Sequence, residues 1–242
     1  MKPALGFLVA LATSACAPSL GGSSRDEIIR HIVPSTVQLR CEREGGVRRA
    51  ASGVVLAVNA ETRRSWILTT RHFLEPVTKQ EIHVIIPGRK GRVKTHLIAV
   101  SEDADLALLV ADGVTLVPVT LKESAKLGDD VWIVAFPWGR RLTVVGGVVS
   151  QISAEAGEAP VEGPARMVDA SVSYGASGGG VFDAVSGALI GVVESHRTAR
   201  VTTPGPPEHV IEIPVPGETT LVSTELILRF MDQAGLAQLL RR

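Results

Sequence analysis

The sequence predicts an all-β protein, and three observations support this fold class. Short runs rich in Val, Ile, Leu and Thr follow one another along most of the 242 residues, and such runs are typical of strands. The chain also holds 24 Gly and 14 Pro, which favour turns between strands. Strand-like and helical segments do not alternate along the sequence, so a parallel α/β fold is disfavoured.

The first 24 residues are set apart from the predicted fold. Lys2 precedes the apolar stretch Leu5–Ala12, and small residues lead on to Cys16. Because this stretch is too short to span a bilayer permanently, residues 1–16 are predicted to be an export signal. Cleavage before Cys16 would resemble bacterial lipoprotein processing and leave a cysteine for lipidation, whereas cleavage after Ala17 would release an ordinary secreted protein. Residues 17–24 follow as a flexible tether.

Helices are expected near the two ends of the folded region. Ser24 and Glu27 fit a capping box, which predicts a short helix over Arg25–His31 that stops before Pro34. Near the C-terminus, Ser223 or Thr224 is expected to cap an amphipathic helix. The residues expected on its apolar face are Leu226, Leu228, Phe230 and Met231.

Strand-like segments between these helices fall into two sets. The first set comprises Thr36–Glu42, Ala51–Val58, Ser65–Thr70, Ile82–Ile86, Arg92–Val100 and Leu106–Val110. The second set comprises Val131–Phe136, Leu142–Ile152, Met167–Val172, Gly179–Phe182, Ala188–Val193 and Val210–Pro214. Two Pro-rich segments, 202–207 and 214–217, are expected to be loops. Cys41 is expected to be a buried or half-buried strand thiol.

The most informative stretch is Gly175-Ala-Ser177-Gly-Gly-Gly180, which follows a strand-like run. Glycines on both sides of a serine let the backbone turn sharply and aim consecutive N–H groups at a carbonyl oxygen. We therefore expect Ser177 to be a nucleophile in a loop that also builds an oxyanion hole. A glycine-rich turn with a solvent-facing serine is the structural alternative.

A serine hydroxyl becomes a good nucleophile only beside a base that a third group orients. Of the six histidines, His72 lies where an apolar strand-like run ends and a turn begins. His83 and His96 lie inside strand-like segments, where a half-exposed sheet position is expected. The remaining three, His31, His196 and His209, are expected to be exposed.

The candidate acid precedes a continuous apolar run. Asp103 and Asp105 stand directly before Leu106–Val110, which reads as a buried strand. A carboxylate that enters a core needs a hydrogen-bond donor, and an imidazole N–H would supply one. Asp105 is the better candidate because it abuts the apolar run, and Asp103 is the alternative.

In chain order, the segments Leu68–His72, Asp103–Leu108 and Asp169–Gly180 resemble the motifs of the chymotrypsin-like serine proteases. The similarity is greatest to the bacterial HtrA/DegP-like branch and covers residues 33–195. It implies a double β-barrel of two Greek keys, over about residues 33–112 and 128–222, within a protease domain of residues 25–242. The segment after Ser195 is too short for the PDZ domain that many members carry.

The resemblance also implies roles for individual residues. His72 falls on the general base, Asp105 on the orienting acid and Ser177 on the nucleophile. The oxyanion hole would consist of the N–H groups of Gly175 and Ser177. A primary substrate pocket would have Ser171 at its base and a wall formed by Val193, Glu194 and Ser195. Arg71, Ala176 and Gly180 depart from the usual Ala, Asn and Pro of the branch.

We therefore expect an exported serine endopeptidase that acts on a protein or peptide through an acyl-enzyme. No metal or cofactor is expected, because neither H-E-x-x-H nor paired C-x-x-C is present. The formal net charge is zero, which gives no electrostatic case for a nucleic-acid partner or an anionic membrane surface. Contact with a membrane is expected only through a lipid on Cys16, in the bacterial cell envelope.

Two alternative functions stay open. The first is a protease-like binding module that no longer turns over substrate. The second is an esterase or lipase, because Gly175–Gly179 also fits the G-x-S-x-G pattern of the α/β-hydrolases. That fold requires a helix directly after the serine, whereas Val181–Val193 reads as a β-hairpin.

Overall fold

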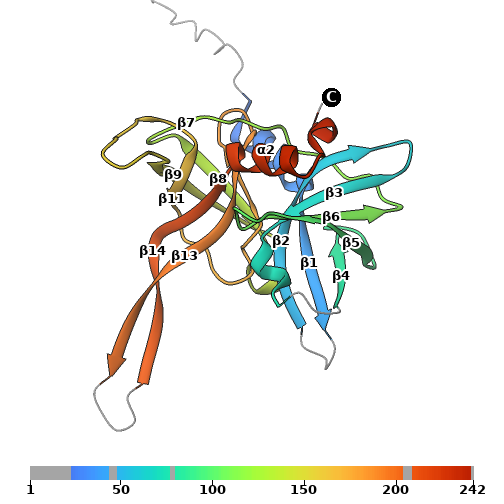
Figure 1. The fold of residues 1–242 in the computed structure, drawn as a ribbon, viewed down its shortest axis with the longest axis horizontal. Helices are drawn as coiled ribbons and strands as arrows, with labels where there is room; N and C mark the ends of the chain where they lie inside the picture. The colour runs from blue at the N-terminus through green and yellow to red at the C-terminus, as the bar shows by residue number, and fades with distance from the viewer. Residues whose placement is uncertain (1–22, 44–47, 77–79, 204–208, 241–242) are drawn as a thin grey trace, which may run out of the picture.

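Two closed β-barrels form the body of the protein in a computed structural model that describes residues 23–43, 48–76, 80–203 and 209–240. The barrels lie side by side in Figure 1, the first in blue to green and the second in yellow-green to red-orange. The predicted all-β double barrel is confirmed. The predicted export signal (1–16), its lipidation site Cys16 and most of the tether (17–24) lie outside the described residues.

The first barrel contains all six strands of the first predicted set, in the order β1-β2-β3-β6-β5-β4. Its strands are β1 (Thr36–Arg43), β2 (Arg48–Asn59), β3 (Arg64–Thr69), β4 (Gln80–Ile85), β5 (Val93–Val100) and β6 (Ala107–Asp112). Inward-facing Val, Leu and Ile side chains fill the interior, and Cys41 is fully buried among them as expected. His83, expected to be half-exposed, is also buried; its cross-strand neighbours are Arg40 of β1 and Lys94 of β5.

The second barrel follows the order β11-β14-β13-β12-β8-β9. Its strands are β8 (Asp130–Ala135), β9 (Thr143–Ile152), β11 (Ala165–Asp169), β12 (Gly180–Asp183), β13 (Leu189–Thr203) and β14 (His209–Ser223). A small separate sheet, β7 (Ala125–Lys126) with β10 (Glu162–Gly163), was not predicted.

Two predictions about the end of this barrel are wrong. β13 and β14 extend far beyond the predicted Ala188–Val193 and Val210–Pro214, and they pair with each other as a long antiparallel ribbon. Residues 214–217, expected to be a loop, lie inside β14. Proline is tolerated there because β14 pairs with β11 only at Thr219 and Thr220, so no second partner needs the N–H groups that Pro214 and Pro216 lack. Of the other Pro-rich segment, residues 204–208 lie outside the described residues.

Two α-helices cover the junction between the barrels in the described part of the chain. α1 (Arg25–Ile32) begins with the predicted capping box of Ser24 and Glu27, and α2 (Thr224–Gln233) is capped by Ser223. The buried face of α2 contains Ile227, which the sequence prediction omitted, while Leu226 and Leu228 are only partly buried. Neither helix is long and apolar enough to cross a membrane.

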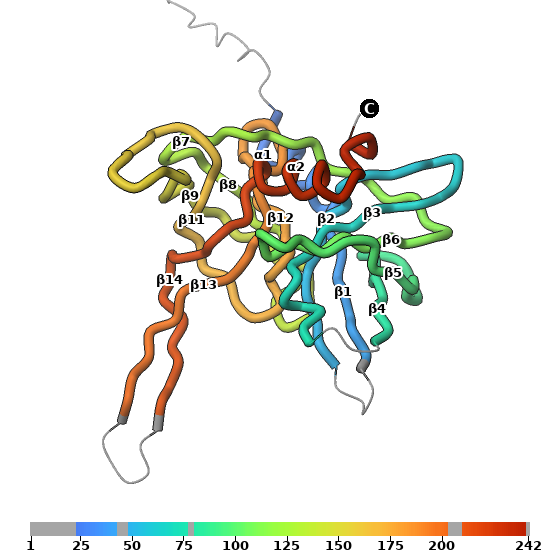
Figure 2. Tube along the Cα trace, viewed as in Figure 1, coloured from blue at the N-terminus to red at the C-terminus, as the bar shows by residue number. Residues whose placement is uncertain are grey.

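A third hydrophobic cluster lies between the two barrel interiors and joins them. It includes Leu68 and Leu108 from the first barrel, Phe182 and Val192 from the second, and Phe230 from α2. Figure 2 shows α1 and α2 passing over this junction, with β2 and β12 beneath them. Because a buried apolar side chain contributes roughly 1.5–3 kcal/mol, such a cluster holds the barrels in one relative orientation. Side chains from both barrels can therefore form one site.

The segment between the barrels is held by a partly buried ion pair. Lys122 contacts Asp183 at the end of β12, and Asp183 also accepts hydrogen bonds from the backbone N–H groups of Val185 and Ser186. Burial raises the pKa of Asp183, but the bonds from Lys122 and Ser186 outweigh it, so the pKa lies below its ordinary value of 3.8.

We predict that Asp183→Asn lowers the free energy of unfolding at pH 7 by about 1–3 kcal/mol, because Lys122 loses its nearest and most buried charged partner. Only the Asp129 carboxylate, at 3.6 Å, then remains beside Lys122. A carboxylate with a lowered pKa stabilises the fold above its unfolded-state pKa, and this stabilisation is lost as the pH falls through the folded-state pKa. The difference between wild type and variant should therefore shrink below pH 3.8. Urea unfolding at neutral and acidic pH measures it.

Asp112→Asn is the matched control, because the Arg64–Asp112 pair is about half exposed on both sides. Such a surface pair contributes roughly 0–1 kcal/mol. An Asp183→Asn effect no larger than that of Asp112→Asn, or one that does not change with pH, would contradict the prediction.

Candidate active site

His72 and Asp105 come together at the edge of the first barrel. The one-turn 3-10 helix η2 (Arg71–Leu74) follows β3 and presents His72, while Asp105 ends the loop before β6. The Asp105 carboxylate accepts a hydrogen bond from the His72 backbone N–H at 2.9 Å, and its other oxygen lies 2.6 Å from His72 Nδ1. With Nδ1 as the donor to the carboxylate, Nε2 is left as the basic nitrogen.

The charge state of Asp105 suits this pairing. Burial raises the pKa of the Asp105 carboxyl. Hydrogen bonds from the His72 ring and backbone, together with the nearby Arg71 charge, lower this pKa by more than burial raises it. The net pKa lies below the ordinary value of 3.8. Asp105 is therefore ionised at neutral pH and can stabilise a positive charge on the imidazole.

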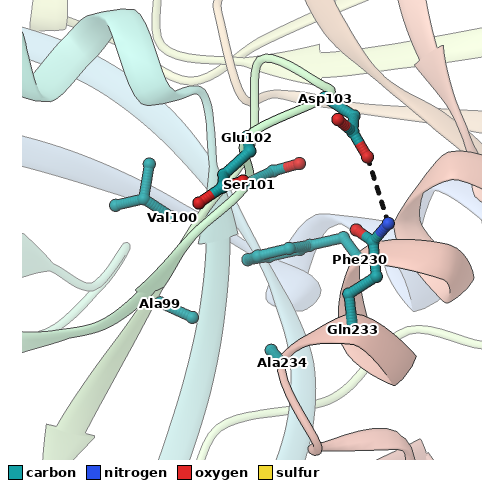
Figure 3. Close-up of a pocket in the computed structure, with 8 residues that line it drawn as sticks. All are labelled: Ala99, Val100, Ser101, Glu102, Asp103, Phe230, Gln233 and Ala234. Carbon is teal, nitrogen blue, oxygen red and sulfur yellow. Dashed lines mark hydrogen bonds between the residues drawn. The ribbon is translucent and has the colours of Figure 1, made fainter.

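The alternative acid, Asp103, faces a different part of the molecule. Its carboxylate accepts a hydrogen bond from Gln233 Nε2 of α2 at 3.1 Å, as Figure 3 shows. Both residues line a cavity of about 480 Å³ between α2 and the loop that ends at Asp105. Of the two aspartates, the structure thus pairs only Asp105 with His72.

Arg71, the residue beside the candidate base, braces the loop that carries the acid. Its guanidinium donates hydrogen bonds to the backbone carbonyls of Ser101 at 2.9 Å and Glu102 at 3.4 Å. Nε of Arg71 also lies 3.3 Å from the Glu75 carboxylate. The departure from the usual Ala at this position therefore adds a link between η2 and the Asp105 loop.

Ser177 lies on the loop between β11 and β12, and two glycines of this loop adopt positive φ angles. Gly175 has φ +89° and Gly178 has φ +79°, values that favour glycine. A Cβ added to Gly178 would also lie 2.2 Å from the backbone oxygen of Ser52. Among the hydrogen bonds of the described residues, none engages the N–H of Gly175 or Ser177, so both amides remain available to an oxyanion.

Ser52 of β2, in the opposite barrel, holds this loop in place. Its N–H donates to the Ser177 carbonyl at 2.9 Å, and its hydroxyl donates to the Gly175 carbonyl at 2.8 Å. The same hydroxyl accepts from the Phe136 N–H at 2.8 Å, while its own carbonyl accepts from Thr69 Oγ1 at 2.8 Å. One fully buried serine therefore links the first barrel to both residues whose amides could bind an oxyanion.

Sequence reasoning missed Ser52, although one signal was present. The Ser52-Gly53 pair interrupts a strand-like apolar segment, and small residues inside a strand often mark a close backbone approach. A Cβ on Gly53 would lie 2.8 Å from the Ile67 side chain.

His72 and Ser177 line the same cleft, of about 200 Å³, between the barrels. Phe73, Tyr174 and Gly175 contribute to its walls. Among the described residues, no hydrogen bond joins the Ser177 hydroxyl to the imidazole, and such bonds are often long before substrate binds. β12 follows the serine as a strand, which removes the α/β-hydrolase alternative because that fold requires a helix there.

The four residues predicted to form a substrate pocket have different surroundings. Ser171 lines a mainly apolar cavity of about 400 Å³. Val193 is buried in the core of the second barrel. Glu194 pairs with Arg166 at 3.1 Å, and the Ser195 hydroxyl bonds that of Thr220 at 2.8 Å. Val193, Glu194 and Ser195 do not line the Ser171 cavity.

Comparisons with known proteins agree with the geometry. The family of trypsin-like peptidase domains matches residues 51–192. The chain is 28% identical over 179 residues to a probable periplasmic DegP-like serine endoprotease of Hahella chejuensis, covering 71% of this chain and 35% of that protein. It is 25% identical over 150 residues to the serine endoprotease DegS of Salmonella typhimurium, covering 60% and 39%. The chain thus spans little more than a third of these relatives.

Solved structures show the same fold. A serine endoprotease from Yersinia pestis superposes with a TM-score of 0.67 at 20% identity, over 88% of this chain and 66% of that one. An HtrA-type protease, AlgW, solved with a tripeptide, superposes with a TM-score of 0.64 at 22% identity, over 87% and 63%. The resemblance drawn from the three sequence motifs is thereby confirmed at the level of the family.

We predict that Ser52→Ala slows phosphonylation of Ser177 by a fluorophosphonate at least about tenfold, because the Gly175 carbonyl loses the hydroxyl bond that holds this part of the loop. The bond from the Ser52 N–H to the Ser177 carbonyl is retained in the variant. It should also lower the free energy of unfolding by about 1–3 kcal/mol, since the buried Phe136 N–H and Gly175 carbonyl lose a partner. Mass spectrometry measures labelling, and urea unfolding measures stability.

The control for stability alone is Ser65→Ala. The buried Ser65 hydroxyl also bridges two backbone groups, the Val114 carbonyl at 2.9 Å and the Leu116 N–H at 3.1 Å, but inside the first barrel. It should destabilise the fold similarly and leave labelling of the folded protein unchanged. Equal labelling rates in the two variants would show that Ser52 does not position the loop.

Proposed function

The chain belongs to the family of trypsin-like peptidase domains, and on this premise we propose that it is a serine endopeptidase of the HtrA type. His72, Asp105 and Ser177 are proposed as its catalytic triad. The observation that carries the proposal is the double hydrogen bond from His72 to Asp105 in a cleft that also contains Ser177. This arrangement supplies an oriented base beside a hydroxyl nucleophile.

The first chemical step forms the acyl-enzyme. Ser177 Oγ attacks the carbonyl carbon of a peptide bond while His72 Nε2 takes the hydroxyl proton. The imidazolium is stabilised by the Asp105 carboxylate, and the negative oxygen is bound by the amides of Gly175 and Ser177. The C–N bond then breaks, the imidazolium gives its proton to the leaving amine, and an ester to Ser177 remains.

The second step returns the enzyme. A water molecule attacks the ester carbonyl as His72 removes its proton, and the same two amides bind the oxyanion again. The C–O bond to Ser177 breaks, the proton passes to Ser177 Oγ, and the new carboxyl group leaves.

The environment of the Ser171 cavity bears on substrate choice. No charged side chain is among its described lining residues, and Glu194, which could have favoured a basic side chain, is paired with Arg166. If this cavity receives the side chain before the cleaved bond, we expect an uncharged residue there, because an unpaired buried charge is strongly disfavoured.

We predict that Ser177→Ala and His72→Ala each abolish measurable cleavage of an unfolded protein substrate, with kcat reduced by several orders of magnitude and the double variant little worse. Asp105→Asn should reduce kcat by about 10⁴-fold, because it favours the wrong tautomer of the base. Asp103→Asn is the matched control and should keep nearly full activity, since Asp103 contacts Gln233. Cleavage kinetics and fluorophosphonate labelling measure these effects.

If Asp103→Asn loses activity while Asp105→Asn retains it, the acid that orients His72 is Asp103 and not Asp105. A folded wild-type protein that neither cleaves nor labels would favour the non-catalytic binding module.

Export to the cell envelope is proposed as well. It is supported by the apolar segment before Cys16 and by the similarity to proteases of Hahella chejuensis and Haemophilus influenzae that are named as periplasmic. A lipid on Cys16 would hold the protein at a membrane, because each buried CH₂ contributes about 0.8 kcal/mol.

We predict that Cys16→Ser releases the protein from the membrane fraction while fluorophosphonate labelling of Ser177 stays unchanged. Cell fractionation and intact mass of the mature protein measure this. Cys41→Ser is the matched control and should leave localisation unchanged, since Cys41 is buried in β1. A mature N-terminus at Pro18 without lipid mass would indicate plain secretion.

A further inference from the structure

The ribbon formed by β13 and β14 extends well beyond the second barrel. In Figure 1 it points away from the body, on the side opposite to α1 and α2. Its strands pair from Thr198 with Pro214 out to Thr203 with His209. Register shifts between Val193 and Ser195, and again between His196 and Thr198, mark bulges, which bend a strand where it leaves a sheet.

The two faces of this ribbon differ in character. Ala199 is opposite Ile213 and Val201 is opposite Ile211, so these four apolar side chains share one face. Val201, Ile211 and Ile213 are 44%, 49% and 48% exposed. The intervening pair on the opposite face is Arg200 and Glu212, joined by an ion pair of 3.0 Å. The ribbon therefore presents an apolar face that is about half exposed in the described chain.

One edge of the ribbon begins at the nucleophile loop. The Val193 N–H donates to the Gly179 carbonyl, and the Val193 carbonyl accepts from the Gly178 N–H, both at 2.8 Å. This edge of β13 is the one that faces away from β14, and β12 pairs with it only as far as Val192. Beyond that point, the described strands leave the edge unpaired out to Thr203. At about 3.4 Å per residue, the open edge from Ser195 is roughly 30 Å long.

We propose that this edge and the apolar face beside it bind the N-terminal side of an extended polypeptide substrate, well beyond the residues next to the cleaved bond. The inference rests on the proposed peptidase function. Every strand pair of this barrel is antiparallel, and a substrate strand added in the same sense places its C-terminal end at Ser177. Its N-terminal residues then lie along β13 on the ribbon.

A bound substrate strand would turn the two-stranded ribbon into a three-stranded sheet. An isolated two-stranded ribbon is marginal in water, whereas three strands with an apolar face are stable. Peptide addition to an open sheet edge gives affinity through main-chain hydrogen bonds, and side chains at alternate positions give selectivity. Alternate substrate residues would join the face of Ala199, Val201, Ile211 and Ile213, so the preferred substrate is an unfolded chain with apolar residues at every second position.

The experiment compares fluorogenic peptides that share one cleavage sequence, taken from the sites cut in an unfolded protein. The short peptide has four residues before the cleaved bond. Two long peptides have nine, with either apolar or Ser residues at alternate added positions. We expect KM for the long apolar peptide to be at least about tenfold lower than for the other two, which corresponds to about 1.4 kcal/mol. Equal KM values for all three would overturn the proposal.

The test variant is Val201→Ser/Ile211→Ser/Ile213→Ser, and the control is Val210→Ser. Val210 is 60% exposed and, with its partner Thr202, lies on the opposite face of the ribbon. The triple variant should lose the advantage of the long apolar peptide while cleavage of the short peptide and fluorophosphonate labelling stay unchanged. The control should keep that advantage. A triple variant that retains the low KM would overturn the proposal.

Two further measurements separate this proposal from its premise. Binding of the long apolar peptide to Ser177→Ala, followed by fluorescence anisotropy, should also be weakened by the triple substitution, and it requires no turnover. If the wild type cleaves nothing, the proposed function has failed. The anisotropy result alone then decides whether the open edge of β13 binds the peptide. A different result would overturn the proposal by assigning the apolar face to a second copy of the chain. In that case sedimentation velocity would show a dimer that the triple substitution dissociates, and KM would not depend on peptide length.

Discussion

The candidate site depends on a set of hydrogen bonds that cross from one barrel to the other at Ser52. Each barrel is a closed sheet, but backbone groups of Ser52 and Phe136 find their hydrogen-bond partners across the junction. The His72 imidazole and the Asp105 carboxylate belong to the first barrel, whereas the proposed nucleophile, Ser177, and the amides proposed to bind an oxyanion belong to the second. Bonds from Ser52 to the Gly175 and Ser177 carbonyls fix the loop to the wall that carries His72. The apolar cluster between the barrels makes those bonds possible because it holds the two barrels in one relative orientation.

Three carboxylates around the site, those of Asp105, Asp103 and Glu75, each have a defined partner. Asp105 receives two bonds from His72, Asp103 receives one from Gln233, and Glu75 lies beside Arg71. Arg71 also binds the carbonyls of the loop that ends at Asp105. The acid therefore cannot swing away from the base without breaking contacts with η2. Because ordering is built into the folded protein, little reorganisation is required when charge develops on the imidazole.

Local sequence patterns were enough to predict the strands of both barrels and to single out His72, Asp105 and Ser177, because each lies at a strand end where its neighbours have a recognisable character. The remaining features depend on contacts between distant segments. Ser52 is an ordinary strand serine until the barrels dock, and His83 acquires its neighbours Arg40 and Lys94 only when β1 and β5 pair with β4. The proline-rich sequence at 214–217 resembles a loop, yet it continues β14, where Pro214 pairs with Thr198 of β13. Tertiary pairing overrides local propensity in such cases.

The division of the site between two barrels has a consequence for biosynthesis. A chain made from its N-terminus presents His72 and Asp105 long before Ser177 has been synthesised, and Ile227, Phe230 and Met231 of α2 complete the inter-barrel cluster later still. The loop acquires its order only when the second sheet has closed and docked. A partly made or misassembled chain therefore carries the candidate groups of one half without the means to align them with the other. The proposed hydrolysis accordingly requires the finished tertiary structure.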